Sequence, residues 1–450
     1  MEKLKQNKMG VYPIPRLLCS VSLPLMISML VQSLYNIVDG IFVAQYIGSD
    51  GVTATTVAYS AQLLMLSVSV GTGVGVNSML SRSLGKRDFD AVNKAATNGL
   101  LLAVIWAAVF MLAGALGANA FIRIFNSDET IVDLGTRYLR ICMVGCLGIF
   151  LATTGERLLQ ATGNTLLSMI AQLAGAVTNI VLDPIMIHTM RLGIEGAAIA
   201  TIIGQFVAAA ASLALNAVRN KEIHFQIRGF RPDFGIIGGI YKVGAPTIVM
   251  QTMNSFMMML MLQIMRLSEY GSLAQGFYGI YYKLWTFLYM PVNGLAQGLI
   301  PVVGYNYGAK NGRRVWDAFR LTAVVAVAVM ALGTLVFHLL GAPLLGLYQA
   351  TQEQLDFGVR AMGIMSMTFP FAGLTICIGF ACSGMGNGVV SMVATIVREL
   401  AVLIPLAWAF GRFFGFDATW YAVTVAETAA LVYALAALAA QYRKKVKPIL

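Results

Sequence analysis

Residues 17–46 read LLCSVSLPLMISMLVQSLYNIVDGIFVAQY, and Asp39 is the one charged residue among them. A helix needs about 20 mostly apolar residues to cross the hydrocarbon core of a bilayer. Eleven further stretches of this kind follow along the chain. The twelve stretches lie roughly at residues 17–46, 52–80, 93–117, 134–154, 165–190, 194–217, 239–265, 275–304, 319–341, 357–380, 388–410 and 418–440. The sequence therefore predicts an all-α, polytopic membrane protein with twelve transmembrane helices.

The composition of the chain agrees with a membrane location. Of its 450 residues, 58% are hydrophobic and 11% are charged, whereas a soluble protein carries about 25% charged residues. With the N-terminus placed inside, 22 lysines and arginines fall on inner segments and four (Arg123, Arg191, Arg266 and Arg412) on outer segments. Since this bias sets the orientation, we expect both termini in the cytoplasm. The net charge of +11 then reflects topology, and we expect no nucleic-acid partner.

The cysteines, histidines and glycines offer no site for catalysis. The five cysteines lie inside apolar stretches, without the spacing of a metal site or a disulfide framework. The three histidines (His188, His224 and His338) are far apart and lack an acidic partner at a useful interval. Gly71, Gly73 and Gly75 resemble a dinucleotide loop but lie inside an apolar stretch, which favours close helix packing. We expect no enzyme and no cofactor, and transport would be driven by an ion gradient.

The two halves of the chain match at a nearly fixed offset. Pro24 pairs with Pro246, 222 residues on. Three further pairs are 223 residues apart: Gly85 with Gly308, Arg137 with Arg360, and Gly163 with Gly386. Four anchors in the same order indicate an internal duplication.

The duplication predicts the organisation of the molecule. Six helices per half is an even number, so both halves enter the membrane from the same side. We expect a pseudo-twofold axis along the membrane normal and a central cavity between the halves. The predicted parts are an N-terminal lobe at 1–220, a cytoplasmic linker at 221–238 and a C-terminal lobe at 239–450.

Five acidic residues lie in or at the edge of the apolar stretches: Asp39, Glu156, Asp183, Glu399 and Glu427. A carboxylate at membrane depth costs about 2.5 kcal/mol or more, so it usually faces the interior of the bundle and often has a function. At a rise of about 1.5 Å per residue, Asp39 lies roughly 28 Å and Asp183 roughly 27 Å along their helices. Both therefore fall in the outer half of the membrane.

Three polar residues reach a similar depth. Asn179 lies one turn before Asp183 on the same helix face, and Tyr138 and Thr201 come early in helices that run inward. Two carboxylates with an amide, a phenol and a hydroxyl predict a cation or proton site. Pro184 frees backbone carbonyls and allows the helix to bend there.

The second half does not repeat this site. At the same offset Asp39 maps to Leu262 and Asp183 to Leu406. The ionisable candidates there are Lys283, Arg398, Glu399 and Glu427. We favour an internal ion pair of Arg398 with Glu427 over a second coupling site.

The seventh and eighth stretches are rich in methionine and aromatic residues. Seven methionines lie between Met250 and Met265, and Tyr278, Tyr281, Tyr282, Trp285 and Tyr289 follow. Methionine suits surfaces that accept varied apolar partners, and aromatic rings can hold cations. A drug-binding wall and ordinary contact with lipid and core are equally supported.

Residues 291–310 read PVNGLAQGLIPVVGYNYGAK, which resembles the helix 8 signature of the multidrug and toxic compound extrusion (MATE) family. Similar resemblances lie in Pro24 with Asp39, in the Gln160–Asn164 turn and in Leu182-Asp183-Pro184. The resemblance covers nearly the whole chain. It implies a twelve-helix carrier of two six-helix lobes in the inner membrane of a prokaryote. Such a carrier works by alternating access and exports organic, mainly cationic compounds against inward Na⁺ or H⁺.

The resemblance also implies site residues. The family's coupling positions fall on Asp39, Tyr138, Asn179, Asp183 and Thr201, with a possible Na⁺ at Asp39, Asn179 and Asp183. The glutamate in helix 7 and the aspartate in helix 10 that some members use are missing here. We expect function as a monomer in the lipid bilayer, with small-molecule drugs or toxic organic cations as substrates. Candidate substrate-binding residues are Gln32, Tyr35, Asn36, Gln251, Met253, Asn254, Met257 and Tyr282.

Three alternatives remain to be compared with an exporter. A lipid-linked precursor flippase of the same superfamily would have a more cationic cavity than Lys283, Arg398, Arg137 and Arg140 could line. The other common type of twelve-helix carrier expects an aspartate before its glycine-and-arginine run, and in residues 84–88 the order is reversed. An intramembrane aspartyl protease could use Asp39 and Asp183, but neither lies in the motif such an enzyme needs.

Overall fold

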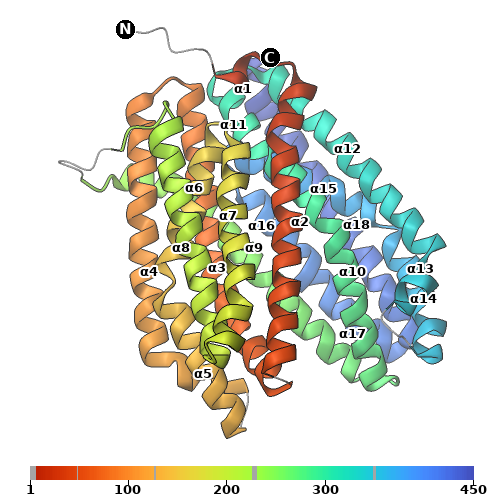
Figure 1. The fold of residues 1–450 in the computed structure, drawn as a ribbon. Coiled ribbons are helices and arrows are strands. Elements are labelled where there is room, and N and C mark those ends of the chain that lie inside the picture. The colour runs from red at the N-terminus through yellow and green to blue at the C-terminus, as the bar shows by residue number, and fades with distance from the viewer. Residues whose placement is uncertain (1–6, 48, 126–127, 226–230, 348–350) are drawn as a thin grey trace. The chain divides into compact units, whose positions relative to one another are not determined.

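The computed structural model describes residues 7–47, 49–125, 128–225, 231–347 and 351–450, and the side chains at 35–41, 44, 49, 50, 52 and 272 lie outside this description. All the regular elements in the described part are helices (Figure 1). The α-helices are α1 (Lys8–Val11), α2 (Ile14–Tyr46), α3 (Ser49–Gly85), α4 (Phe89–Phe125), α5 (Glu129–Val144), α6 (Leu147–Ala161), α7 (Thr165–Pro184), α8 (Gly193–Arg219), α9 (Phe234–Arg266), α10 (Gly271–Gln297), α11 (Leu299–Gly308), α12 (Gly312–Leu339), α13 (Gly341–Gly346), α14 (Gln352–Ser366), α15 (Phe369–Gly384), α16 (Val389–Ile396), α17 (Ile404–Phe413) and α18 (Tyr421–Gln441). The π-helices are η1 (Ile185–Thr189), η2 (Val397–Leu403) and η4 (Tyr442–Val446), and the 3₁₀-helices are η3 (Phe416–Trp420) and η5 (Lys447–Ile449).

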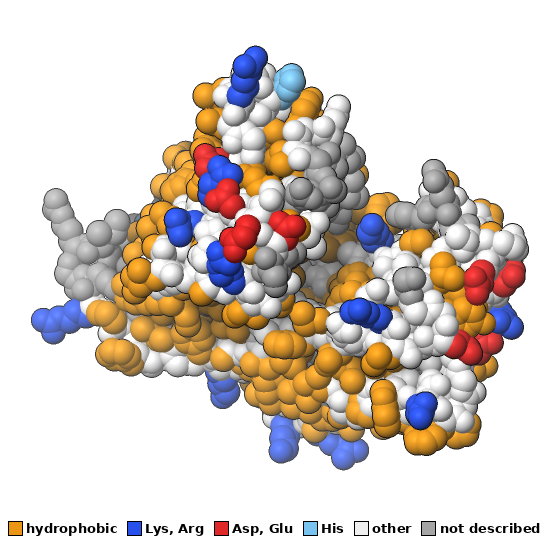
Figure 2. Space-filling model, turned by 90° about the horizontal axis from the view of Figure 1, so that it is seen from below, with side chains coloured by type: hydrophobic (Ala, Val, Ile, Leu, Met, Phe, Trp, Pro, Cys, Tyr) orange, Lys and Arg blue, Asp and Glu red, His pale blue; other side chains and the backbone are white. Residues whose placement is uncertain are grey.

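The predicted membrane protein is confirmed. Within the described residues, ten helices are long and apolar enough to cross a membrane, and twelve spans result if each of two bent pairs is one span. The bent pairs are α5 with α6, at 47°, and α14 with α15, at 44°. The stretches expected as single helices at 134–154 and 357–380 are therefore each broken near the middle. In Figure 2 hydrophobic side chains cover broad areas of the visible surface, and acidic ones gather in a few small groups beside basic ones.

The chain divides into two compact units. The first unit comprises Met1–Lys8 and Ile27–Ile248, and the second comprises Met9–Met26 and Val249–Leu450. Helices α2 and α9 each contribute residues to both units, because the division falls inside them at Met26 and Ile248. The predicted lobes at 1–220 and 239–450 do not follow these divisions and stay a prediction.

Local backbone features recur at the offset of the predicted duplication. Gly163 and Gly386 both have positive φ, at 86° and 78°. Each is followed by an asparagine whose N–H donates back into the preceding helix, to Leu159 O in the first unit and to Cys382 O in the second. This is the pattern of a helix that ends in a Schellman motif, where glycine avoids the steric cost of positive φ.

An ion pair recurs at the same offset. Arg137 Nη1 lies 3.4 Å from Glu195 Oε1 in the first unit, and Arg360 Nη2 lies 3.2 Å from Asp417 Oδ2 in the second. Because Arg137 and Arg360 are matched anchors, the recurrence supports the duplication.

The glycines of α3 serve helix packing, as predicted. A Cβ added to Gly71 would lie 2.9 Å from Gly244 O, and one added to Gly244 would lie 2.9 Å from Gly71 O. Gly75 likewise approaches the backbone carbonyl of Ile240. Within the first unit, α3 and the first half of α9 thus touch backbone to backbone, which a larger residue would prevent.

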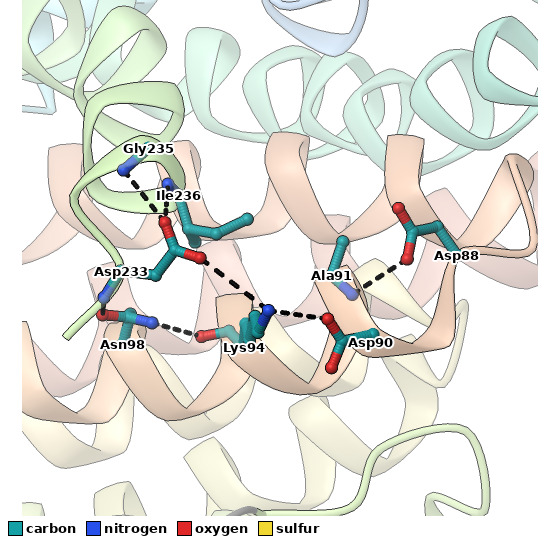
Figure 3. A network of polar contacts seen from close by, with 8 residues as sticks. All are labelled: Asp88, Asp90, Ala91, Lys94, Asn98, Asp233, Gly235 and Ile236. Atoms are coloured by element: carbon teal, nitrogen blue, oxygen red, sulfur yellow. Dashed lines mark hydrogen bonds and ion pairs between the residues drawn. The ribbon is translucent and has the colours of Figure 1, made fainter. Parts of the chain in front are cut away.

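A polar network fixes the start of α9 against α4 in the first unit (Figure 3). Asp233 Oδ1 accepts hydrogen bonds from Gly235 N and Ile236 N, at 3.0 and 3.1 Å, as an N-cap carboxylate does. Lys94 Nζ lies 2.7 Å from Asp90 Oδ2 and 4.0 Å from Asp233 Oδ2, and Asp233 N donates to Asn98 Oδ1.

Aromatic contacts hold the second unit together. The Phe277 ring of α10 lies 5.4 Å from the rings of Phe357 and Trp420, in edge-on geometry. Phe416 contacts the same two rings at 5.2 Å. Edge-on aromatic pairs add stability beyond their buried area, and these position α10 against α14 and the start of α18.

Candidate functional site

The candidate cation site lies at the end of α7 in the first unit. Asp183 is the residue before Pro184, and the π-helix η1 follows directly. Pro184 has no N–H, so the helical hydrogen bond to the carbonyl of Ile180 cannot form. A wide π-turn after a proline is a common mark of a functional position.

Three of the predicted polar residues meet there. Asn179 Nδ2 donates to Asp183 Oδ1 at 3.2 Å and to Thr201 Oγ1 of α8 at 3.4 Å. Asp183, Asn179 and Thr201 are 0%, 2% and 8% exposed. Helices α7 and α8 lie side by side (Figure 1), so the i, i+4 spacing on α7 and a single residue of α8 suffice to build the group. A buried carboxylate, amide and hydroxyl can exchange a proton or provide oxygens to a small cation.

Tyr138 belongs to the same region of the first unit. It lies on α5, is 5% exposed, and shares an apolar cluster with Ile187 of η1 and with Ala197 and Ala198 of α8. Asp39 lies on α2, but its side chain is outside the described residues, as are those of Tyr35 and Asn36. Their predicted roles stay predictions.

The amide oxygen of Asn179 is a further candidate ligand. Among the described residues it has no hydrogen-bond partner and is buried. Carbonyl and carboxylate oxygens suit hard cations. No group of three or more His, Cys, Asp or Glu side chains that could hold a metal ion occurs in the part of the chain that the structure describes, so the possible Na⁺ at Asp39, Asn179 and Asp183 stays a prediction.

The remaining substrate-binding candidates are half-buried. Gln32 lies on α2, Gln251, Met253, Asn254 and Met257 lie on α9, and Tyr282 lies on α10. Within the second unit Tyr278 Oη lies 3.6 Å from Met257 Sδ, which places the aromatic face of α10 against the methionines of α9. Half-buried methionine and tyrosine side chains fit the predicted drug-binding wall, which stays a prediction.

The ion pair expected in the second unit is confirmed. Arg398 Nη1 lies 3.4 Å from Glu427 Oε1. Sequence reasoning did not join Glu399 to this pair, although Arg398 Nη2 lies only 2.8 Å from Glu399 Oε1. Adjacent residues of an α-helix point about 100° apart, but here the two lie in the π-helix η2. Lys283 is exposed on α10.

The fold and the site define a class. The chain is a multi-pass helical membrane protein with a duplicated architecture and a buried carboxylate site in one unit, which is the construction of a secondary transporter. The MatE family pattern matches residues 24–185 and again residues 246–409. The chain therefore belongs to the MatE family.

Curated relatives agree with this assignment. The multidrug export protein MepA of Staphylococcus aureus is 24% identical over 435 residues, which cover 96% of this chain and 94% of the relative. The protein of the same name from Staphylococcus haemolyticus is 24% identical over 413 residues, covering 90% and 89%. Such relatives are multidrug efflux transporters, and this chain is a multi-pass transporter of that family.

Solved structures share the fold. A crystal structure of a MATE protein in complex with MaL6 superimposes with a TM-score of 0.91 at 22% identity, covering 98% of this chain and 100% of the other. A MOP superfamily transporter from Pyrococcus furiosus gives a TM-score of 0.92 at 22% identity, covering 100% and 99%. The predicted fold class of twelve transmembrane helices in two six-helix lobes is thereby confirmed.

Proposed function

We propose that this protein is a secondary active multidrug exporter. It would antiport organic, mainly cationic and amphipathic compounds against inward Na⁺ or H⁺ by alternating access. The observation that carries the proposal is the buried group of Asp183, Asn179 and Thr201. A carboxylate this deep in a membrane helix is costly unless it exchanges its charge with a proton or a cation.

The coupling ion would alternate with the substrate. With a proton or Na⁺ bound, Asp183 is neutralised, and the site tolerates a closed, dry environment. When the ion leaves, the carboxylate charge favours water and a cationic substrate. Two states with different affinities for ion and substrate are all that thermodynamic coupling requires. No cofactor is needed for this cycle.

The test is efflux of ethidium from proteoliposomes under an imposed gradient. Asp183→Asn and Asp39→Asn keep the size of the side chain but remove its charge, so we expect each to abolish gradient-driven efflux while the protein still inserts. Asp356→Asn, at an exposed position of α14, should export as the unaltered protein does. Full efflux by Asp183→Asn would overturn the assignment.

The same vesicles identify the ion. A Na⁺ gradient at constant pH should drive efflux if Na⁺ couples, and a pH gradient without Na⁺ should do so if H⁺ couples. Movement of a headgroup-labelled lipid with no dye efflux under either gradient would instead favour a flippase.

The proposal includes a location. We infer an inner membrane of a prokaryote, both termini in the cytoplasm and a functional monomer surrounded by lipid. The support is the number of lysines and arginines, 22 on one side and four on the other, in the predicted topology.

A further inference from the structure

The internal repeat shows where the two units differ in chemistry. In the first unit a Cβ added to Gly175 of α7 would lie 2.6 Å from Gly204 O of α8. The offset of 223 residues maps these two glycines to Arg398 and Glu427, which are also in contact. At the same place in the repeat, the second unit thus has charged side chains where the first has a glycine contact.

Arg398, Glu399 and Glu427 form what we term the Arg398 cluster. The guanidinium lies between the carboxylates, with 2.8 Å from Nη2 to Glu399 Oε1 and 3.4 Å from Nη1 to Glu427 Oε1. The three side chains are 15%, 0% and 12% exposed. A pair at 3.4 Å is a weaker contact than one at 2.8 Å, so the guanidinium compensates Glu427 less well than Glu399.

The charges of the cluster do not balance. Two carboxylates against one guanidinium leave a net charge of minus one when all three are ionised. The other titratable groups that interact electrostatically with the cluster, among the described residues, are Tyr278, Tyr281 and Tyr289 of α10. A phenol adds no positive charge. Lys283 is exposed and lies about 140° around α10 from Tyr278, at about 100° per residue.

Two carboxylate oxygens also lack a hydrogen-bond donor. Glu399 Oε2 and Glu427 Oε2 are buried, and neither has a hydrogen-bond partner among the residues described. An ionised carboxylate can only accept, whereas a protonated one can donate. One proton therefore removes the excess charge and supplies a missing donor.

A proton fits the cluster better than a metal ion does. The guanidinium already lies against one oxygen of each carboxylate and repels a further cation. The described part of the chain places no third carboxylate, histidine or cysteine near enough to complete a metal site.

The backbone at the cluster is irregular. Arg398 and Glu399 lie in the π-helix η2, and Pro405 follows in the first turn of α17. Pro405 has no N–H to donate to the carbonyl of Ala401, so the regular helical ladder is interrupted there. Single π-turns inside helices frequently occur at functional sites.

We propose that the Arg398 cluster binds one exchangeable proton, shared between Glu399 and Glu427, and is a second proton site in the unit that lacks the Asp183 group. The proton comes from water and returns to it, and the O–H bond is the one bond made and broken. The use of this proton in transport rests on the proposed function, whereas its binding does not.

Infrared difference spectra between acidic and alkaline buffer test the proposal on the full-length protein in lipid. Asp39→Asn and Asp183→Asn are introduced together to silence the first unit. This background should still show the carbonyl stretch of a protonated carboxyl group that disappears at alkaline pH. Glu399→Gln and Glu427→Gln should each lower its amplitude by the same amount, because either leaves one carboxylate per guanidinium. Arg398→Met should raise the cluster's contribution about twofold, since two carboxylates then take up protons.

Glu353→Gln, at an exposed position of α14, is the matched control and should leave the amplitude unchanged. Size-exclusion elution reports folding, and if one glutamine variant fails to fold, the other and Arg398→Met still decide. The proposal is overturned if the background shows no such signal, if both glutamine variants leave it unchanged, or if adding Na⁺ at constant pH removes it. Loss of dye efflux with the signal intact would contradict the exporter but leave this proton site standing.

Discussion

Asn179 connects the side chains of the candidate cation site. One amide nitrogen carries two hydrogens, so it can donate to Asp183 Oδ1 and Thr201 Oγ1 at the same time. Both acceptors are buried, and neither can exchange this donor for bulk water. The amide therefore determines how the carboxylate points, even if it never binds the ion itself.

Asn179→Ala should weaken ion-driven efflux. A hydrogen bond to a charged group contributes about 1.5–3 kcal/mol, so we expect efflux at limiting ion gradients to fall about tenfold or more. Thr178→Ala is the control, because its hydroxyl bonds only to Ala174 O of its own helix. Initial rates of ethidium efflux measure both variants. Equal losses in the two would point to a general destabilisation of α7.

Glu222 gives the first unit a pH-sensitive contact outside the membrane spans. Asn7 Nδ2 donates to both of its carboxylate oxygens, at 2.7 and 2.8 Å. Burial raises the pKa of Glu222, and the hydrogen bond from Asn7 opposes this only in part. A carboxyl whose pKa is raised on folding stabilises the protein at acidic pH, and this contribution is lost as pH rises through the folded pKa.

Glu222→Gln should therefore flatten one component of the pH dependence of stability. The unaltered protein should lose melting temperature relative to Glu222→Gln between about pH 4 and pH 7. The two melting curves in detergent are compared across that range. Parallel curves would mean that Glu222 does not titrate differently in the folded and unfolded chain.

At the scale of the element, the start of α9 depends on one carboxylate. Asp233 caps the helix through two backbone N–H groups and lies 4.0 Å from Lys94. Asp233→Ala should cost about 1 kcal/mol, since an N-cap side chain contributes about 0.5–2 kcal/mol. Asp233→Asn keeps an acceptor and loses only an exposed ion pair, so its melting temperature should stay near that of the unaltered protein. A large loss in Asp233→Asn would assign the stability to the ion pair instead.

The contact of α7 with α8 gives a second prediction for an element. A Cβ on Gly175 would meet Gly204 O at 2.6 Å and the Ala208 Cβ at 2.8 Å. Gly175→Ala should thus destabilise the first unit by about 1–3 kcal/mol, as overpacking does. Gly117→Ala on α4 is the matched control, because nothing lies within 4 Å of its added Cβ, and alanine favours a helix over glycine by about 1 kcal/mol. Thermal unfolding should separate the two variants in opposite directions.

The elements also show what the sequence could predict. The spacing of Asn179 and Asp183 and the depth of Thr201 were enough to assemble the first-unit group, because helical periodicity fixes which side chains share a face. The joining of Glu399 to Arg398 was missed, since it depends on a π-helix that no propensity encodes. The bends between α5 and α6 and between α14 and α15 were missed for a related reason: glycine and serine inside apolar runs do not interrupt hydropathy.

At the scale of the whole molecule, the duplication explains much of the fold but not the function. The family pattern matches twice, and left-handed residues recur at the same offset. The side chains at matched positions nevertheless differ, with Asp183 opposite Leu406 and Gly175 opposite Arg398. Sequence comparison of the halves predicted this asymmetry. It could not predict that α2 and α9 would each be divided between compact units, because that depends on packing between distant segments.

The predicted orientation of the whole chain can be tested with single cysteines. Lys86, after α3, and Lys444, near the C-terminus, fall on the predicted inner side, and Arg412, at the end of α17, falls on the outer side; all three are exposed. In a background without the five native cysteines, four of which are buried, a membrane-impermeant maleimide should label Arg412→Cys in intact cells. Lys86→Cys and Lys444→Cys should react only after permeabilisation. Because basic residues near helix ends resist translocation, the two inner positions must behave alike if both halves enter the membrane from the same side. Labelling of Lys444→Cys but not Lys86→Cys in intact cells would place an odd number of crossings between them and contradict the twelve-helix topology with both termini inside.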